Sequence, residues 1–251
     1  VTLTNNRDGK SYEFPILDAT VGPSVIDIST LYKETKMFTY DEGYTSTASC
    51  KSDITYIDGD AGKLMYRGYD IAYLANQKSF LDTAYLLLNG ELPTKEELEN
   101  FTIEMKKRSF VHEGIKKLFD SFPDGAHPMA ILSAGVSALS TFYYKHLEIK
   151  TKREYTEMAN RIVAKIPTLA AFSYRYSNGL PIIYPDMSKG FTENFLYMLR
   201  AYPHSYIELK PIEIKALDTI FTLHADHEQN ASTTAVRNLA STNAHPYAAI
   251  S

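Results

Sequence analysis

The chain has 251 residues, 44% of them hydrophobic, and a formal net charge of −4 at pH 7, so a large core and one or two domains are possible. Its Lys and Arg residues are scattered among acids, which excludes the basic stripe of a nucleic-acid-binding protein. No apolar run is long enough to span a membrane and residues 1–20 lack a signal-peptide pattern, so we expect a cytoplasmic protein with no membrane partner.

Residues 1–70 form the part of the chain that predicts strands. Short β-leaning runs at 11–16 and 53–57 are separated by turn signals, of which Asp8-Gly9 and Asp58-Gly59 are the clearest. Glycine suits these turns because it tolerates a positive φ. We therefore expect a small β-rich region over residues 1–70, followed by a helical domain over residues 71–251.

The pattern becomes helical from Ser79 onward. Ser79 is a typical N-cap for the apolar run that follows it, and Gly90 stands where a helix commonly ends. Thr94 and Glu97 then match a capping box at the start of another helix. The fold class that we predict is mainly α, a multi-helical body with a small N-terminal β-rich cap.

Further helices are expected along the rest of the chain. Small residues over 128–144 predict a buried helix that packs closely on its neighbours. Residues 153–178 are helical in pattern but contain Pro167, which predicts a kink or two separate helices. Another helix is expected around 191–201, and Pro211 opens the next one.

Two histidines and two carboxylates are concentrated in residues 224–230, His-Ala-Asp-His-Glu-Gln-Asn. On a helix opened by Pro211, His224 continues the apolar stripe and Glu228 falls on the same face. Asn230 begins a run of residues that can cap another helix, whose free amides can hold a carboxylate. A helix break beside histidines predicts a pocket for an anionic ligand.

Other interpretations of these histidines stay open. His224 fits a buried structural histidine equally well, with neighbouring acids that only cap or bridge. A zinc site competes, since histidines at positions i and i+3 with nearby carboxylates can bind a metal. The order differs from the His-Glu-x-x-His of zinc proteases, and the single Cys50 offers no support, so we predict no metal site.

The ten residues 224–233, His-Ala-Asp-His-Glu-Gln-Asn-Ala-Ser-Thr, resemble the oxaloacetate-binding segment of citrate synthases, in particular the type II enzymes of many bacteria. Further runs that are similar to landmarks of this family lie at 38–41, 45–50, 54–60, 66–70, 87–91 and 127–129. The resemblance implies a citrate-synthase-like fold and the condensation of acetyl-CoA with oxaloacetate to citrate. Acetyl-CoA is then a co-substrate, and no further cofactor is expected.

The resemblance also implies roles for individual residues. His227 would polarise the carbonyl of oxaloacetate, Asn230 would lie in the same substrate shell, and His224 would support them. The type II enzymes are often inhibited by NADH at a remote site, and the matching positions here are Lys107, Arg108, Ser109, Tyr143, Arg161 and Lys165. A Lys-Lys-Arg run is more often a solvated helix face. The family also implies a homodimer or homohexamer, for which the helix over 128–144 is a candidate contact.

Several family landmarks do not occur in the chain. These are the Gly-Gly-Ala-Asn-Glu and Gly-His-Arg-Val-Tyr segments, the catalytic Asp and the C-terminal arginines. We therefore expect a truncated chain that has no turnover, because it lacks the groups that enolise acetyl-CoA. Two alternatives stay open beside citrate synthase. One is 2-methylcitrate synthase, which uses propionyl-CoA, and the other is a non-catalytic derivative retained for assembly or for binding a small anion.

Overall fold

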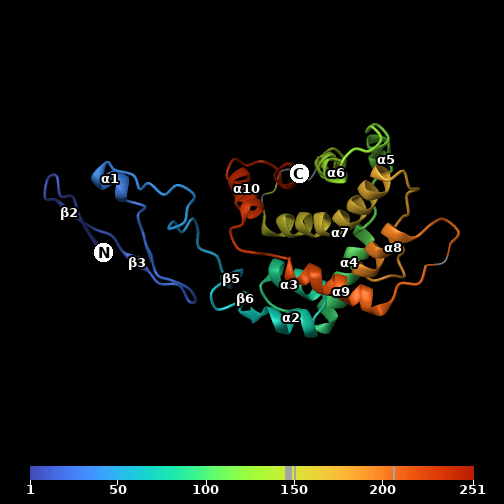
Figure 1. Cartoon of the computed structure of the whole chain (residues 1–251), viewed down its shortest axis with the longest axis horizontal. Helices are drawn as coiled ribbons and strands as arrows, with labels where there is room; N and C mark the ends of the chain where they lie inside the picture. The colour runs from blue at the N-terminus through green and yellow to red at the C-terminus, as the bar shows by residue number, and fades with distance from the viewer. Residues whose placement is uncertain (145–148, 150, 206) are drawn as a thin grey trace.

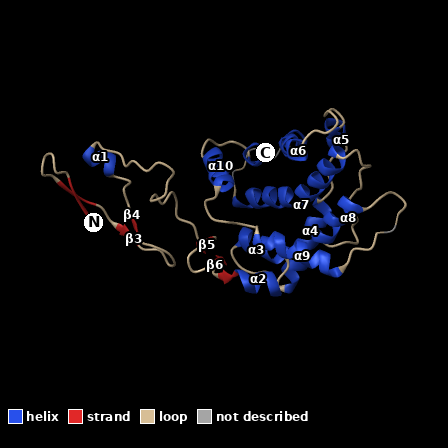
Figure 2. Ribbon diagram, in the orientation of Figure 1, coloured by secondary structure: helices blue, strands red, loops and turns tan. Residues whose placement is uncertain are grey.

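A computed structural model describes residues 1–144, 149, 151–205 and 207–251. Helices dominate the molecule (Figure 2), so the prediction of a mainly α fold is confirmed. All strands in the described part of the chain lie between Thr2 and Asp70. The division into two regions at residue 70 stays a prediction. Among the described residues, no helix combines the length and the apolar character that crossing a membrane requires.

The first 42 residues form an arm that extends to one side of the helical body (Figure 1). We call residues 1–42 the N-terminal arm. It contains two antiparallel pairs and one short helix: β1 (Thr2–Thr4) with β2 (Ser11–Glu13), β3 (Ile16–Leu17) with β4 (Val25–Ile26), and α1 (Leu31–Thr35). Only Phe14 and Leu31 of the arm are buried. Paired strands this short have few side chains to bury, so the arm has almost no core.

A three-stranded antiparallel sheet joins the arm to the helices. Its strands are β5 (Thr55–Asp58), β6 (Lys63–Tyr66) and β7 (Tyr69–Asp70), with β6 in the middle and Thr55 opposite Tyr66. The turn between β5 and β6 has Gly62 at a φ of +63°, a conformation that glycine adopts without strain. We call these three strands the N-terminal sheet.

The helical body contains α2 (Ile71–Gln77), α3 (Phe80–Asn89), α4 (Lys95–Arg108), α5 (Gly114–Phe119), α6 (Pro128–Phe142), α7 (Lys152–Ser177), α8 (Phe191–Arg200), α9 (Pro211–Leu223), α10 (Ala231–Ala240) and α11 (Pro246–Ile250). Helix α7 runs through the middle of the body (Figure 1) and packs against α4, α6 and α8. Helices α2 and α3 pack against α9, and α11 packs against α6.

The helix ends that the sequence predicts are confirmed. The hydroxyl of Ser79 accepts from the Asp82 amide, and the Asp82 side chain accepts from the Ser79 amide. The same reciprocal pair joins Thr94 and Glu97 at the start of α4. Gly90 ends α3 with a φ of +99°. Each cap satisfies amides that the first turn of a helix leaves without partners.

Helix α7 is a single element of 26 residues, so of the two alternatives predicted at Pro167 the separate helices are wrong, and the kink stays a prediction. Proline removes one hydrogen bond in a helix interior, but tertiary packing can outweigh that loss. Both halves of α7 are packed: Ile162 precedes Pro167 in the main core, and Leu169 and Phe172 follow it there.

The main core lies between α5, α6, α7 and α11. Its buried members include Phe119, Ile131, Leu139, Leu169 and Tyr247. Helix α6, which we expected to be buried, buries one face only: Ile131, Gly135 and Leu139 are buried, whereas Ala130, Ser137 and Thr141 on the opposite side are exposed. On the buried face, a Cβ at Gly135 would lie 2.9 Å from the ring of Phe119. The small residue at this position therefore permits the close approach of α5 and α6.

Candidate functional site

Helix α9 ends at Leu223, and residues 224–230 form a loop that leads to α10; we call these residues the histidine loop. The prediction that His224 and Glu228 share one helical face is therefore wrong. His224 is the C-cap of α9, whereas Glu228 has a φ of +58°, which a right-handed helix does not contain. The predicted break in the helix beside the histidines is confirmed.

Both histidine rings are tied to the last turn of α9. Nδ1 of His224 lies 2.9 Å from the carbonyl oxygen of Ile220, and Nε2 of His227 lies 3.0 Å from that of Leu223. A carbonyl oxygen only accepts, so each of these ring nitrogens donates its proton. The rings are exposed, with centroids 6.0 Å apart. The interpretation of His224 as a buried structural histidine is therefore wrong, and the second nitrogen of each ring remains for a ligand.

The two carboxylates of the histidine loop contact the N-terminal sheet. The hydroxyl of Thr55 donates to Oδ2 of Asp226, and the amide of Ile57 donates to Oε1 of Glu228 at 2.6 Å. The amide of Glu228 itself donates to Oδ2 of Asp226 at 3.1 Å. The acids therefore bridge the loop to β5, as one of the alternative interpretations proposed.

Tyr66 links the histidine loop to the last turn of α9 by hydrogen bonds. Its side chain is fully buried, and its hydroxyl donates to the carbonyl oxygen of Thr222 at 3.1 Å. The same hydroxyl accepts from the amide of Asp226 at 3.3 Å. Burial raises the pKa of Tyr66, so the hydroxyl keeps the proton that it donates. We did not assign a role to Tyr66 or Thr55 from the sequence; their only signal was their place in the family-like runs 66–70 and 54–60.

Asn230 begins helix α10. Its side-chain oxygen accepts from the amide of Thr233 at 2.8 Å, so Asn230 is the N-cap among the candidates that the sequence offered. The cap occupies that oxygen and leaves the side-chain NH2 group for a ligand. The histidine loop thus joins the carbonyl end of α9 to the amide end of α10, and an anion is favoured beside the latter.

The histidine loop offers few ligands to a metal ion, because the carboxylates of Asp226 and Glu228 accept hydrogen bonds from β5. Nowhere in residues 1–144, 149, 151–205 and 207–251 do three His, Cys, Asp or Glu side chains gather as a metal site requires. The zinc interpretation of the histidines gains no support from the described structure.

The structure brings together most of the positions that match the NADH site of type II enzymes. The guanidinium carbon of Arg161 lies 4.4 Å from the ring centroid of Tyr143, and Nζ of Lys165 lies 5.6 Å from it. Burial raises the pKa of Tyr143, while Arg161 and then Arg108 act to lower it. Lys107 is exposed, and Arg108 pairs with Glu104 at 2.6 Å.

Lys165 differs from the other cations in this group because its side chain is only 4% exposed. Its ammonium donates to the carbonyl oxygens of Arg108, at 2.8 Å, and of Phe110, at the end of α4. Burial, with smaller contributions from Arg161 and Arg108, lowers the pKa of Lys165 to about 8. Thr168 donates to the carbonyl oxygen of Ser109 at 2.8 Å. Helix α7 therefore holds the segment after α4 by two side chains.

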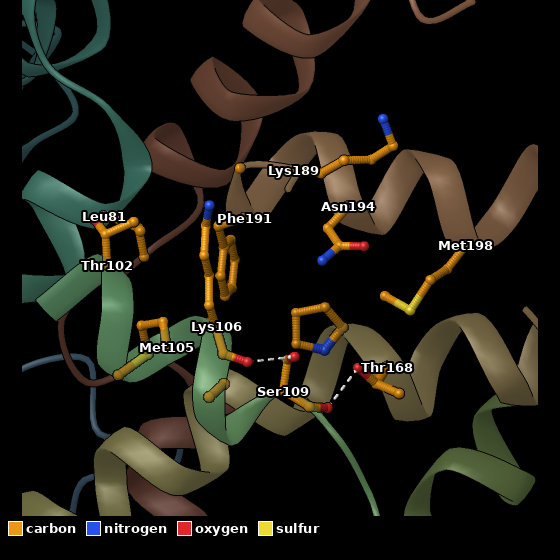
Figure 3. A pocket seen from close by; sticks show the side chains of 13 residues that line it. Leu81, Thr102, Met105, Lys106, Ser109, Thr168, Lys189, Phe191, Asn194 and Met198 are labelled. Carbon is orange, nitrogen blue, oxygen red and sulfur yellow. Dashed lines mark hydrogen bonds between the residues drawn. The ribbon is translucent and has the colours of Figure 1, made fainter. Parts of the chain in front are cut away.

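A small cavity of about 20 Å³ lies between α4, α7 and α8 (Figure 3). Its lining includes Met105, Lys106, Ser109, Phe191 and Asn194, and of the predicted site residues only Ser109 takes part. This volume holds about one water molecule. The cavity is too small for a substrate or a dinucleotide, and its lining contains no residue of the histidine loop.

Comparison with known proteins gives a consistent result. The family model described as "Citrate synthase, C-terminal domain" matches residues 43–251. A citrate synthase of Helicobacter pylori (strain J99) is 51% identical over 260 aligned positions, which cover 100% of this chain and 61% of that protein. The chain therefore spans about three fifths of the length of this relative.

Two crystal structures of citrate synthases are similar in fold. The enzyme from Pyrobaculum aerophilum matches with a TM-score of 0.77 and 32% identity, covering 94% of this chain and 55% of that one. The enzyme from Thermotoga maritima MSB8 matches with a TM-score of 0.71 and 30% identity, covering 84% of this chain and 53% of that one.

Proposed function

This chain belongs to the citrate synthase family, and we propose that its protein condenses acetyl-CoA with oxaloacetate to give citrate and coenzyme A. The observation that carries the proposal is the exposed ring of His227, fixed at the end of α9 beside the first turn of α10. The partial positive charge and the free amides at the N-terminus of α10 suit a small dicarboxylate. The family supports the same substrates, oxaloacetate and acetyl-CoA.

The proposed reaction is an aldol-type addition followed by hydrolysis. The methyl carbon of acetyl-CoA loses a proton to a base, and the resulting enolate carbon bonds to the ketone carbon of oxaloacetate. The ketone oxygen gains negative charge as this bond forms and takes a proton, and water then cleaves the thioester to release coenzyme A. A donor that contacts the ketone oxygen lowers the barrier, because it stabilises the charge that develops there.

His227 is the proposed donor to the ketone oxygen. Its Nε2 already donates to the Leu223 carbonyl, so Nδ1 is the nitrogen that would contact the substrate. Donation from Nδ1 requires a ring that is protonated on both nitrogens. Asn230 would contact a substrate carboxylate through its NH2 group, and His224 would support binding from 6.0 Å away.

Replacing His227 tests this proposal. In the complete-length protein, His227→Gln should reduce kcat for citrate formation by about 10²- to 10³-fold, the range for losing one donor to a developing oxyanion. His204→Gln is the matched control, because His204 is exposed and precedes the start of α9, at the opposite end of that helix from the histidine loop. Equal kcat values for His227→Gln and wild type would contradict the proposal. Running the assay with propionyl-CoA as well separates the 2-methylcitrate alternative, which predicts a higher rate with that thioester.

NADH inhibition is a second part of the proposal. The aromatic face of Tyr143 with Arg161 against it suits an adenine ring and a phosphate. Lys107 and Arg108 would add positive charge near Ser109, whereas the Lys165 ammonium is already bonded to two carbonyl oxygens. Calorimetric titration with NADH should give saturable heat that Arg161→Gln weakens and Arg153→Gln, on an exposed turn of α7, does not. Unsaturable heat with the wild-type protein would rule this part out.

Self-association and cytoplasmic location complete the proposal. Exposed small residues on the outer face of α6 and the exposed Met129 in its first turn suit a contact between subunits in a homodimer or homohexamer. Sedimentation velocity should find a dimer or hexamer that Met129→Glu dissociates; a monomer at micromolar concentration would contradict it.

A further inference from the structure

We infer that the N-terminal sheet positions the histidine loop for its ligand, with Thr55 and Tyr66 as positioning residues that act through Asp226. The inference rests on the proposed function, because it concerns the binding of oxaloacetate. It adds residues that do not touch the substrate and that lie more than 150 positions away in the chain.

The first contact between sheet and loop is made by β5. The Thr55 hydroxyl donates to Asp226, and two residues further along the same strand the Ile57 amide donates to Glu228 at 2.6 Å. Alternate residues of a strand point to the same side, and the amide of Ile57 adds a main-chain contact. Asp226 and Glu228 flank His227 in sequence. The backbone of His227 is therefore held on both sides by one strand.

The second contact is made by β6. Tyr66 pairs with Thr55 across the sheet, so the two hydroxyls belong to one cross-strand pair. The buried hydroxyl of Tyr66 donates to the last turn of α9 at Thr222 and accepts from the amide of Asp226. It thereby joins the helix that carries the acceptor for His227 to the loop that carries His227 itself.

In the histidine loop only Ala225 packs on a hydrophobic cluster, that of Tyr66 and its neighbours, so the loop depends strongly on these hydrogen bonds for its position. His224, His227 and Asn230 are exposed. None of the ten described residues of α10, the helix that follows, is buried. Glu228 adopts a φ of +58°, a conformation that is uncommon for residues other than glycine and asparagine. The side chain of Arg237 in α10 donates to the carbonyl oxygen of Ser49 at 3.0 Å. This bond holds α10 to the segment that leads into β5 of the N-terminal sheet.

Removal of single hydroxyls tests the inference with little change of shape. Thr55→Val and Tyr66→Phe should each accelerate hydrogen exchange of the amides in residues 224–230 of this chain about tenfold. In the complete-length protein, each should weaken oxaloacetate binding about tenfold by calorimetry, with acetyl-CoA binding unchanged. Thr55→Ser keeps the hydroxyl and should restore both values.

Two control variants make the same chemical changes elsewhere. Thr4→Val removes an exposed strand hydroxyl that is hydrogen-bonded to Ser11, and Tyr69→Phe removes a hydroxyl from β7, at the edge of the N-terminal sheet. Both should leave exchange of the loop and oxaloacetate binding as in wild type. In a steady-state assay, the tested variants should raise the KM for oxaloacetate more than they lower kcat, which a general loss of stability would not produce.

Three results would overturn the inference. Unchanged exchange of residues 224–230 in both Thr55→Val and Tyr66→Phe would show that the sheet does not hold the loop. If the amides of residues 224–230 exchange faster in the variants but oxaloacetate binds as tightly as to wild type, the contacts of the sheet stabilise the loop without positioning it for the ligand. A wild-type protein that binds no oxaloacetate would contradict the proposed function and the positioning role together. The hydrogen-exchange measurement would still test, separately, whether the N-terminal sheet holds the histidine loop in place.

Discussion

The helical body and the N-terminal arm both contain many apolar residues, but they use them differently. In the body, Phe119, Leu169 and Phe172 are fully buried around α7. In the arm, Ile16 is 53% exposed and Phe38 is 80% exposed. Long helices in several layers can cover one another, whereas paired strands of two or three residues cannot. Stability should therefore come from the body, and the arm presents apolar surface of the kind that contacts partners.

The largest difference should appear when a core side chain is shortened. Leu169→Ala should lower the free energy of unfolding by about 4 kcal/mol, because it removes buried methyl groups and leaves a cavity. The matched change in the arm, Ile16→Ala, should cost less than about 1 kcal/mol, since the side chain is half exposed. Urea unfolding followed by circular dichroism measures both. Equal losses would show that the arm is packed as well as the body.

A buried cation gives the next effect. The guanidinium of Arg175 is fully buried and donates to the carbonyl oxygens of Pro181, Met198 and Leu199, which joins α7 to the end of α8. Arg175→Met should cost about 3 kcal/mol, because three carbonyl groups lose a donor. Arg153→Met should have an effect near zero, since that side chain is 88% exposed. If Arg175→Met unfolds with the free energy of wild type, the contacts of Arg175 with the end of α8 do not contribute to the cooperative unfolding of the body, which would contradict the expectation.

Lys165 should make the stability of the body depend on pH. Its pKa is lowered to about 8 by burial, so between pH 8 and 10.5 the unfolded chain binds more protons than the folded one. The free energy of unfolding should therefore rise across this window, by at most about 3 kcal/mol, relative to the Lys165→Met variant. Urea titrations of both proteins at several pH values measure the difference, and a difference that stays constant would contradict the expectation.

The smallest effect concerns helix caps. Ser79→Ala should destabilise the body by about 1 kcal/mol, because the Asp82 amide loses its acceptor. Thr30→Ala, at the matched position before α1 of the arm, should change little, since the Thr30 side chain makes no capping hydrogen bond. Thermal unfolding of the two variants measures both effects. An equal loss of stability in the Thr30 and Ser79 variants would contradict the expectation.

The features that could be predicted from the sequence depend on neighbours along the chain. The caps at Ser79 and Thr94 are of this kind, since each needs only a residue three positions away. The turn at Gly9, which has a φ of +73°, and the helix start at Pro211 also depend only on residues nearby in the chain. The choice at Pro167 between one continuous helix and two separate helices could not be made in this way, because packing on several neighbouring helices outweighs the local loss of a hydrogen bond.

In the candidate site, too, the features that depend on nearby residues could be predicted and those that depend on distant residues could not. The concentration of His224 and His227 at a helix break was readable, because both residues and the break lie within seven positions. The direction of the Asp226 and Glu228 side chains was not, since their partners lie 171 positions earlier. A period of 3.6 residues also placed Glu228 on the wrong face, because the helix ends before that residue. Only the docking of the sheet determines where these acids point.

The separation of 171 residues between Thr55 and Asp226 has a consequence for biosynthesis. Ribosomes add about 5–20 residues per second, so roughly 10–30 s pass between the synthesis of the strand and that of its partner. During this interval the sheet and the first helices can form, while the Thr55 hydroxyl contacts water. The histidine loop therefore reaches its place late relative to the strand that holds it, against a surface that already exists.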